Sequence, residues 1–210
     1  MRTVLNQRDR AAEKEFISRL CVIGSFPRSG SHWTRRMIGE IISLRTGIPA
    51  TFGHSLNKLA GFTQMVNAGN WKYHKEPIIW AAHDLRVAPA HWKIYLRRDF
   101  EEVFRSTQKA EKEMPDCWWG GSREECFRKW KHHNEVGCSR AKLVIDYNMT
   151  LTNPETTIRA ICEVLEMNPT DEEVARALFA GRRENMLKEQ GQAAGVMWSM
   201  VNREDAYENC

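Results

Sequence analysis

The apolar residues of this chain follow two patterns that alternate along its length. Four short and nearly continuous apolar runs occupy residues 20–25, 78–82, 92–96 and 142–146. Runs of this length are typical of strands that are buried on both faces of a parallel sheet. The sequence therefore predicts four interior strands.

Segments in which apolar residues recur every three or four positions lie between or after these runs. They predict helices over residues 34–44, 100–113 and 122–140. In the last of these helices, the side chains expected to be buried are those of Cys126, Phe127 and Trp130.

Two later helices begin with recognisable capping residues. Asn153 is suited to the N-cap and Pro154 to the first helical position, which predicts a helix over residues 154–167. Thr170 and Glu173 form a capping box that opens a helix ending at Ala180.

Strands that alternate with helices predict an α/β fold, a three-layer α/β/α arrangement with a central parallel sheet. The length of 210 residues is typical of one domain, so residues 1–210 are expected to form a single unit. Ligands of such sheets bind at the carboxyl ends of the strands. Every candidate site residue named below lies at or after such an end.

Charge and composition argue against several classes of partner. A formal net charge of +4 is too small to indicate nucleic-acid binding. No stretch approaches the ~18 consecutive apolar residues of a membrane helix. The amino-terminal residues 1–16 lack the apolar core of a secretory signal, so a cytoplasmic location is expected.

The six cysteines are scattered and include no C-x-x-C pair, which favours reduced thiols over a disulfide framework. Cys126, His132, His133 and Cys138 are residue types that bind zinc, but they lie in a predicted helix without the usual ligand spacing. No metal site is expected.

The most specific chemistry lies in residues 26–33, Phe-Pro-Arg-Ser-Gly-Ser-His-Trp, between the first strand and the first helix. Small residues before a helix leave backbone N–H groups free at the positive end of the helix dipole. Arg28 adds a charge, and Ser29, Ser31 and Thr34 add hydroxyl donors, so the loop suits a phosphate or a sulfate. A nucleotide P-loop would need a glycine at position 29 and a following lysine, and it has neither.

Residues 26–33 closely resemble the 5′-phosphosulfate loop, [YF]-P-K-S-G-[TS]-[TNH]-W, of the sulfotransferases that use 3′-phosphoadenosine 5′-phosphosulfate (PAPS). Arg98 and Ser106, eight positions apart, resemble the family's 3′-phosphate motif, a strand followed by R-[ND]-P-x-D-x-x-x-S. Tyr147, seven positions before Pro154, is similar to the tyrosine of the family segment Y-E-D-[LM]-x-x-x-P. The three motifs occur in the family's order and span most of the chain.

The resemblance implies a P-loop-like phosphosulfate-binding loop, PAPS as the donor and adenosine 3′,5′-bisphosphate (PAP) as the product. It implies that Arg98 and Ser106 hold the 3′-phosphate. Trp33 would offer a flat face to the adenine, and Tyr147 would border the same base. The residues that the resemblance assigns to the phosphosulfate loop are Arg28, Ser29, Gly30, Ser31, His32, Trp33 and Thr34.

Some positions depart from the family pattern. Arg28 stands where the family has lysine, and since a guanidinium is a poor proton donor, its expected catalytic role is electrostatic stabilisation alone. Phe100 and Glu102 replace the usual proline and aspartate. Arg182 and Arg183 only loosely resemble a carboxyl-terminal R-K-G motif, and either is a candidate contact for the 3′-phosphate.

Transfer to a hydroxyl needs a group that takes its proton, and histidine suits this task near neutral pH. Members of the family carry the base at the end of the strand before the 3′-phosphate strand, often as K-x-H. His83 follows such an apolar run and is the favoured candidate. His74, in a K-x-H triplet, is the alternative.

The expected reaction is an in-line attack of the acceptor on sulfur, with His83 as the base and no metal. The acceptor is expected to be a small molecule, a sugar or a peptide with a hydroxyl group (or an amine). Residues 51–71 and 114–122 are expected to wall its pocket. Because the chain is shorter than many relatives, the rest of the usual wall is either missing or supplied by the partner subunit of a homodimer. The alternatives are a P-loop kinase-like phosphotransferase with Asp146 at its metal, and a catalytically inactive nucleotide-binding relative.

Overall fold

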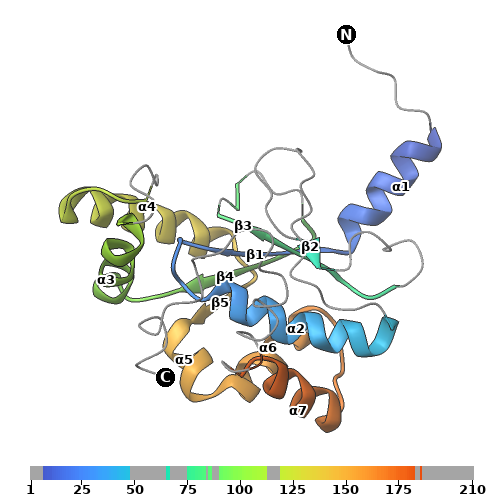
Figure 1. Ribbon diagram of the computed structural model, residues 1–210. Coiled ribbons are helices and arrows are strands. Elements are labelled where there is room, and N and C mark those ends of the chain that lie inside the picture. Colours follow the sequence, from blue (N-terminus) through green and yellow to red (C-terminus); the bar gives the residue numbers. More distant parts are fainter. Residues whose placement is uncertain are drawn as a thin grey trace.

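One five-stranded sheet forms the centre of the protein. The computed structural model describes residues 7–47, 65–66, 75–83, 85–86, 90–112, 119–182 and 185. The strands are β1 (Leu20–Ser25), β2 (Met65–Val66), β3 (Ile78–Ala82), β4 (Trp92–Arg97) and β5 (Leu143–Asp146). They lie in the order β2-β3-β1-β4-β5 (Figure 1). Neighbours pair in parallel except β2, which runs antiparallel to β3 at the edge.

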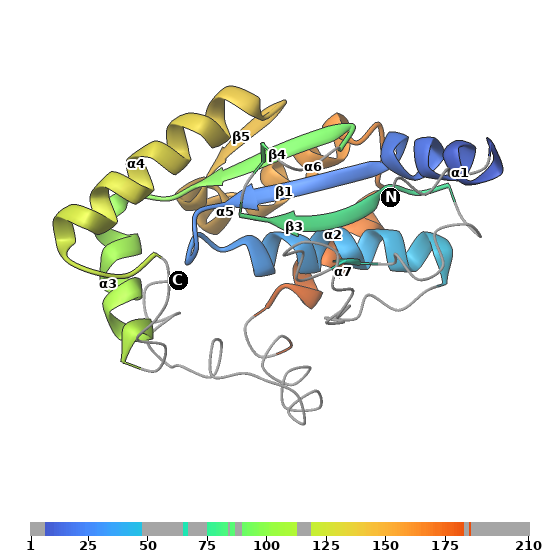
Figure 2. The ribbon, with the colours of Figure 1, turned by 90° about the horizontal axis from the view of Figure 1, so that it is seen from above.

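Helices lie on both faces of this sheet (Figure 2). They are α1 (Gln7–Ser18), α2 (Ser31–Thr46), α3 (Phe100–Glu111), α4 (Arg123–Arg140), α5 (Tyr147–Thr152), α6 (Pro154–Val164) and α7 (Asp171–Ala180). Apolar side chains of α2, α6 and α7 pack with one face of the sheet in the larger core cluster. On the other face, Phe16 of α1 and Cys138 of α4 pack against a smaller cluster. The predicted three-layer α/β/α arrangement is confirmed.

Strand β1 shows why helices must pack on both faces of the sheet. All of its 6 residues are buried. Cys21 and Ile23 belong to the larger core cluster, while Leu20 and Val22 belong to the smaller one on the opposite face. Side chains of a strand alternate between faces, so a continuous apolar run fills two cores at once.

Several predicted boundaries agree with the structure. The strands predicted over residues 20–25 and 78–82 have the observed ends. The capping box of Thr170 and Glu173 opens α7, and a second one, of Ser122 and Glu125, opens α4. Asn153 precedes α6 as expected, but its side chain makes no capping hydrogen bond. The sequence patterns did not predict α1, α5 or β2.

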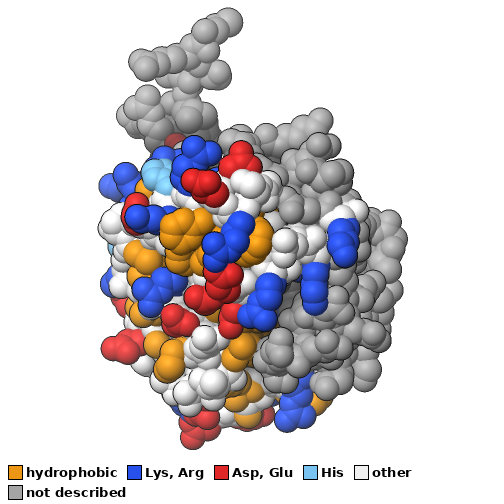
Figure 3. All heavy atoms as spheres, turned by 90° about the vertical axis from the view of Figure 1, so that its left-hand side faces the viewer, with side chains coloured by type: hydrophobic (Ala, Val, Ile, Leu, Met, Phe, Trp, Pro, Cys, Tyr) orange, Lys and Arg blue, Asp and Glu red, His pale blue; other side chains and the backbone are white. Residues whose placement is uncertain are grey.

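The buried stripe predicted for α4 is wrong at Phe127, which is 42% exposed, although Cys126 is buried. The ring of Phe127 lies 5.8 Å from that of Trp130 and 5.0 Å from that of Phe100. This side of α4 therefore faces α3 rather than the sheet, and the narrow contact leaves part of the ring in solvent. Figure 3 shows hydrophobic side chains among Lys and Arg on this end of the molecule.

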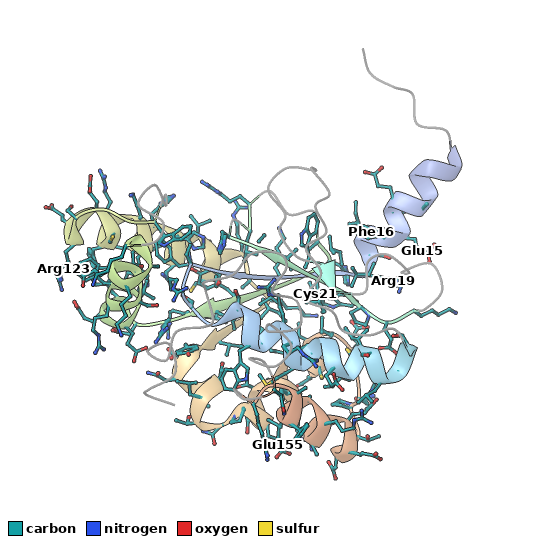
Figure 4. All side chains as sticks on the ribbon, viewed as in Figure 1. Glu15, Phe16, Arg19, Cys21, Arg123 and Glu155 are labelled. Carbon is teal, nitrogen blue, oxygen red and sulfur yellow. The ribbon has the colours of Figure 1, made fainter. Side chains whose placement is uncertain are left out.

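The carboxyl ends of β1, β3, β4 and β5 meet at one edge of the sheet because these strands are parallel. The helices α2, α3 and α5 begin at this edge (Figures 1 and 2). In Figure 4, Phe16, Arg19 and Cys21 mark the amino end of β1, while Arg123 lies at the far end of the molecule. The predicted site residues after β1, β3 and β4 are thus brought to the same edge.

Within the described ranges, no helix is long and apolar enough to cross a membrane. The described cysteines Cys21, Cys126, Cys138 and Cys162 are free thiols. No cluster of three or more His, Cys, Asp or Glu side chains in the described part of the chain is arranged to hold a metal ion.

Candidate active site

The loop between β1 and α2 turns through two residues with left-handed backbone. The φ angle is 71° at Arg28 and 82° at Gly30. Glycine adopts such angles freely, whereas for arginine they cost about 1–2 kcal/mol. Consecutive N–H groups in a turn of this kind form a concave anion-binding surface, and the N-terminus of α2 adds its dipole. The strained backbone of Arg28 therefore makes the loop a candidate functional element.

Two hydroxyl groups beside this turn are buried without a partner. Ser29 and Thr34 are each 1% exposed. Within the described residues, neither Ser29 Oγ nor Thr34 Oγ1 has a hydrogen-bond partner. Since buried hydroxyl groups almost always form a hydrogen bond, these two are candidate donors for a ligand. They fit the anion that the sequence predicts for this loop.

On the β4 side of the loop, hydrogen bonds link Arg28, Arg98 and Ser106, three of the predicted site residues. Arg28 Nε donates to Ser106 Oγ on α3 at 2.9 Å. Arg98, just after β4, donates from Nη1 to the carbonyl oxygen of Arg28 at 2.9 Å and from Nε to Glu102 at 2.9 Å. The structure thus brings Arg28, Arg98 and Ser106 into one cluster, in which Glu102 balances part of the positive charge.

Tyr147 lies between this cluster and the turn. The guanidinium of Arg98 lies 4.2 Å from the centre of the Tyr147 ring. A side chain at Gly30 would place its Cβ 2.3 Å from the same ring. Tyr147 therefore packs against the loop, and glycine at position 30 is required both by φ and by this close approach.

The indole ring of Trp33, on α2, lies next to the end of α7. Its Nε1 donates to the carbonyl oxygen of Gly181 at 2.6 Å, just after α7. Its ring packs against the larger core cluster. Arg182, one of the two carboxyl-terminal arginines, lies over the ring of Phe179 at 5.4 Å.

The candidate base, His83, lies just beyond β3. Its Nδ1 is 2.9 Å from the carbonyl oxygen of Ser25 at the end of β1. Because a carbonyl only accepts, Nδ1 carries the proton, and Nε2 is the basic nitrogen of the neutral ring. Although the residue keeps an exposed surface, burial of the ring lowers the pKa of His83, and the charge of Arg35 lowers it further, against the raising effect of the Ser25 hydrogen bond. The ring is thus neutral near pH 7, as a general base must be.

His133 of α4 is a site residue that the sequence patterns missed. Its Nε2 donates to the carbonyl oxygen of His83, so its Nδ1 accepts from the hydroxyl of Tyr95 at 2.7 Å. Its ring also meets Phe26 edge-on at 5.4 Å. These contacts tie the base to β4, α4 and the start of the anion loop. Nothing local in the sequence distinguishes His133 from its exposed neighbour His132.

Some predicted residues lie outside the described part of the chain. These are His74, Arg183, the side chain of His32, and most of the expected pocket walls, of which residues 65–66 and 119–122 are described. Asp146, the metal ligand in the kinase alternative, lies at the end of β5. It caps α5 through the N–H of Asn148 and pairs with Arg97 at 3.3 Å. Strand β4 lies between β5 and β1.

No protein-family model matches the sequence, and no curated protein matches it. Among solved structures, mouse sulfotransferase SULT7A1 complexed with PAP is similar, with 14% identity and a TM-score of 0.62 over 93% of this chain and 81% of that chain. Retinol dehydratase in complex with androsterone and the inactive cofactor PAP has 14% identity and a TM-score of 0.57, over 88% of this chain and 73% of that chain. Its complex with retinol and PAP gives 11% identity and a TM-score of 0.56, with the same coverage.

The chain therefore has the fold of PAP-binding sulfotransferases, and the resemblance seen in the sequence motifs is confirmed at the level of the fold. Sequence identities of 11–14% establish the fold alone. The function has to be argued from the site.

Proposed function

We propose that this protein is a sulfotransferase that moves a sulfuryl group from PAPS to a hydroxyl or amine group of an acceptor. One observation carries the proposal. An anion loop with two buried, unpartnered hydroxyl groups lies at the same sheet edge as a histidine whose basic nitrogen is Nε2. A turn that only connects β1 to α2 would need neither the unpartnered hydroxyl groups nor the nearby histidine.

The residues of the loop fit the phosphosulfate end of the donor. Ser29 Oγ and Thr34 Oγ1 donate to its oxygens together with the backbone N–H groups of the turn. Arg98 and Ser106 hold the 3′-phosphate, and the fork of the Arg98 guanidinium suits bidentate contact with a phosphate. Arg28, which already contacts Ser106, adds its charge to the anionic donor.

Bound PAPS supplies the sulfuryl group. His83 Nε2 takes the proton from the acceptor hydroxyl, whose oxygen forms a bond to sulfur while the bond from sulfur to the bridging oxygen breaks. The electron pair of that bond stays with PAP, and the loop N–H groups stabilise its charge. Positioning and electrostatics supply most of the rate, as they do in phosphoryl transfer.

The acceptor is proposed to be a small molecule. Two of the similar structures are complexes of retinol dehydratase, one with androsterone and one with retinol. In this chain, the carbonyl oxygen of Trp119 accepts from Cys126 Sγ on α4 at 3.2 Å, and aromatic side chains such as that of Trp119 suit apolar or ring-bearing ligands.

The test is transfer of label from radiolabelled PAPS to a panel of phenols, steroids, retinol, sugars and tyrosine peptides. We expect labelled product from at least one acceptor, inhibition by PAP, and no need for Mg²⁺. Binding of PAP with no labelled product would favour an inactive nucleotide-binding relative. Displacement of PAP by ATP with Mg²⁺ would favour the kinase alternative.

A further inference from the structure

Arg35, on α2 one turn after Ser31, is a buried cation without a carboxylate partner in the part of the chain that the structure describes. It is 4% exposed. Its Nε donates to the carbonyl oxygen of Ser31 at 2.9 Å, and no carboxylate in the described ranges pairs with it. The next residue, Arg36, is buried to 8% exposure but pairs with Glu40 at 2.7 Å. Buried charges are normally paired, so the isolation of Arg35 needs a reason.

The side chain of Arg35 lies beside the first turn of α2, next to the anion loop. The hydrogen bond to Ser31 holds its side chain against the first turn of α2, which follows the loop directly. Thr34, the preceding residue, has one of the two unpartnered hydroxyl groups. Burial lowers the pKa of Arg35 to about 9, so it remains a cation at neutral pH. The charge of Arg35 also acts on His83, because it is one of the causes that lower the pKa of that histidine.

Arg28 lies on the other side of the loop. Strand β1, which leads into the loop, has β3 on one side and β4 on the other. Arg28 Nε contacts Ser106 on α3, which follows β4. His83 follows β3. A group held between the loop and His83 would therefore have the charge of Arg35 on the β3 side, while Arg28 contacts Ser106 on the β4 side.

We infer that Arg35 contacts the sulfuryl group of bound PAPS and is a second catalytic cation of this chain, besides Arg28. The inference rests on the proposed function. The three outer oxygens of the sulfuryl group keep negative charge while the bond to the acceptor oxygen forms and the bond to the bridging oxygen breaks. A guanidinium beside them stabilises this charge without taking part in proton transfer.

The test compares binding of PAP and PAPS by calorimetry in the full chain, because only PAPS carries the sulfuryl group. In Arg35→Gln we expect the affinity for PAPS to fall about 10- to 100-fold, the range for a lost hydrogen bond to a charged group. The affinity for PAP should change less than about 3-fold. Arg36→Gln, the matched control, should lower the melting temperature but leave both affinities unchanged.

Two further readouts separate this role from a structural one. Arg35→Met removes a buried charge without a carboxylate partner, so the melting temperature without nucleotide should stay the same or rise. The pKa of His83, followed by NMR, should rise in Arg35→Gln because a nearby cation is removed. Arg35→Lys, which keeps the charge, should recover part of the PAPS affinity and serves if the neutral variants fold poorly.

Equal losses for PAP and PAPS in Arg35→Gln would assign Arg35 to the nucleotide and overturn the inference. Unchanged affinity for both nucleotides, or a large fall in the melting temperature of Arg35→Met, would also overturn it. If the unmodified protein binds neither nucleotide, the proposed function itself is wrong. The two failures are therefore distinguishable.

Discussion

The two sides of the anion loop differ in how their polar groups are satisfied. On the β4 side, Arg28 bonds Ser106, and Arg98 bonds both Glu102 and the backbone of Arg28. Within the described residues, the hydroxyl groups of Ser29 and Thr34 at the loop have no partner, and Arg35, whose charge acts on His83 on the β3 side, has no carboxylate.

This difference separates two tasks. A cluster that satisfies its own hydrogen bonds keeps its shape before a ligand arrives, so the β4 side is suited to hold a nucleotide in one position. Buried groups without partners are stabilised only when a ligand supplies a hydrogen-bond acceptor or a negative charge. The β3 side is therefore suited to the group that reacts. Substitutions on the β4 side should therefore change nucleotide affinity, and those on the β3 side should change the chemical step.

The largest effect is expected from His83→Gln. Loss of the base should lower kcat about 10²- to 10⁴-fold, the usual contribution of general base catalysis, with PAP affinity unchanged. His91→Gln, which alters an exposed histidine packed on Trp92, is the control and should keep full activity. Retention of kcat in His83→Gln would remove His83 from the mechanism and direct attention to His74.

The substitution Gly30→Ala should disturb both the anion loop and its β4 side. Gly30 lies in the loop and packs against Tyr147, whose ring contacts Arg98. The new Cβ would lie 2.3 Å from Tyr147 in a backbone with φ of 82°. We expect a loss of about 2–4 kcal/mol in the free energy of unfolding and no measurable PAP binding. Gly47→Ala is the matched control, with a φ of 68° and nothing within 4 Å. It should cost only the backbone term of about 1–2 kcal/mol and keep PAP affinity; equal losses in the two variants would contradict the contact with Tyr147.

Arg98→Ala tests the β4 side alone. Calorimetry should show PAP binding weakened by about 1–3 kcal/mol, since hydrogen bonds to a charged phosphate are lost. Arg97→Ala, next to it in the chain, removes an exposed arginine that pairs with Asp146, and it should leave the affinity unchanged. Equal affinities for the Arg98→Ala and Arg97→Ala proteins would rule out Arg98 as a phosphate ligand.

The substitution His133→Ala tests whether His133 positions the candidate base His83. The substitution removes the contact with the His83 carbonyl and the partner of the Tyr95 hydroxyl. We expect about a tenfold loss of kcat, typical of a slightly misplaced catalytic group, with unchanged PAP affinity. His132→Ala, one position earlier on the exposed side of α4, should behave like the unmodified protein. A loss of PAP affinity in His133→Ala would show that His133 supports the loop rather than the base.

The smallest expected effect is a shift in the pH profile. Burial and Arg35 lower the pKa of His83 from its ordinary 6.5, and the base acts only when it is unprotonated. The value of kcat/KM should therefore be constant at neutral pH and fall on acidification, with a midpoint below 6.5. A midpoint above that value would mean that the ring is stabilised in its charged form and would contradict the geometry.

The sequence predicted those parts of the fold that local patterns determine. The run over residues 20–25 ends where β1 ends, because both faces of that strand are buried and no polar position interrupts it. The box of Thr170 and Glu173 marked the start of α7 because its hydrogen bonds are local. The helix α5 was missed because it is short and because burial of Tyr147 against Gly30 depends on the tertiary fold.

The candidate site was predictable as a set of residues but not as an arrangement. The motifs identified Arg28, Arg98, Ser106 and His83, and the structure brings all four to one edge of the sheet. The contact between Arg28 and Ser106 joins positions 78 apart in the sequence, and that between His133 and His83 joins positions 50 apart. Such contacts depend on the strand order, which no local pattern specifies. Arg35 resembled any helical arginine until its burial and lack of a carboxylate were visible.

Calorimetric titration of the folded protein with PAP, in the absence of Mg²⁺, tests the central claim most directly. The account predicts saturable binding of one PAP per chain, weakened by high salt and by Arg98→Ala but not by Arg97→Ala. A titration that releases no heat, together with an unchanged melting temperature in excess PAP, would contradict it.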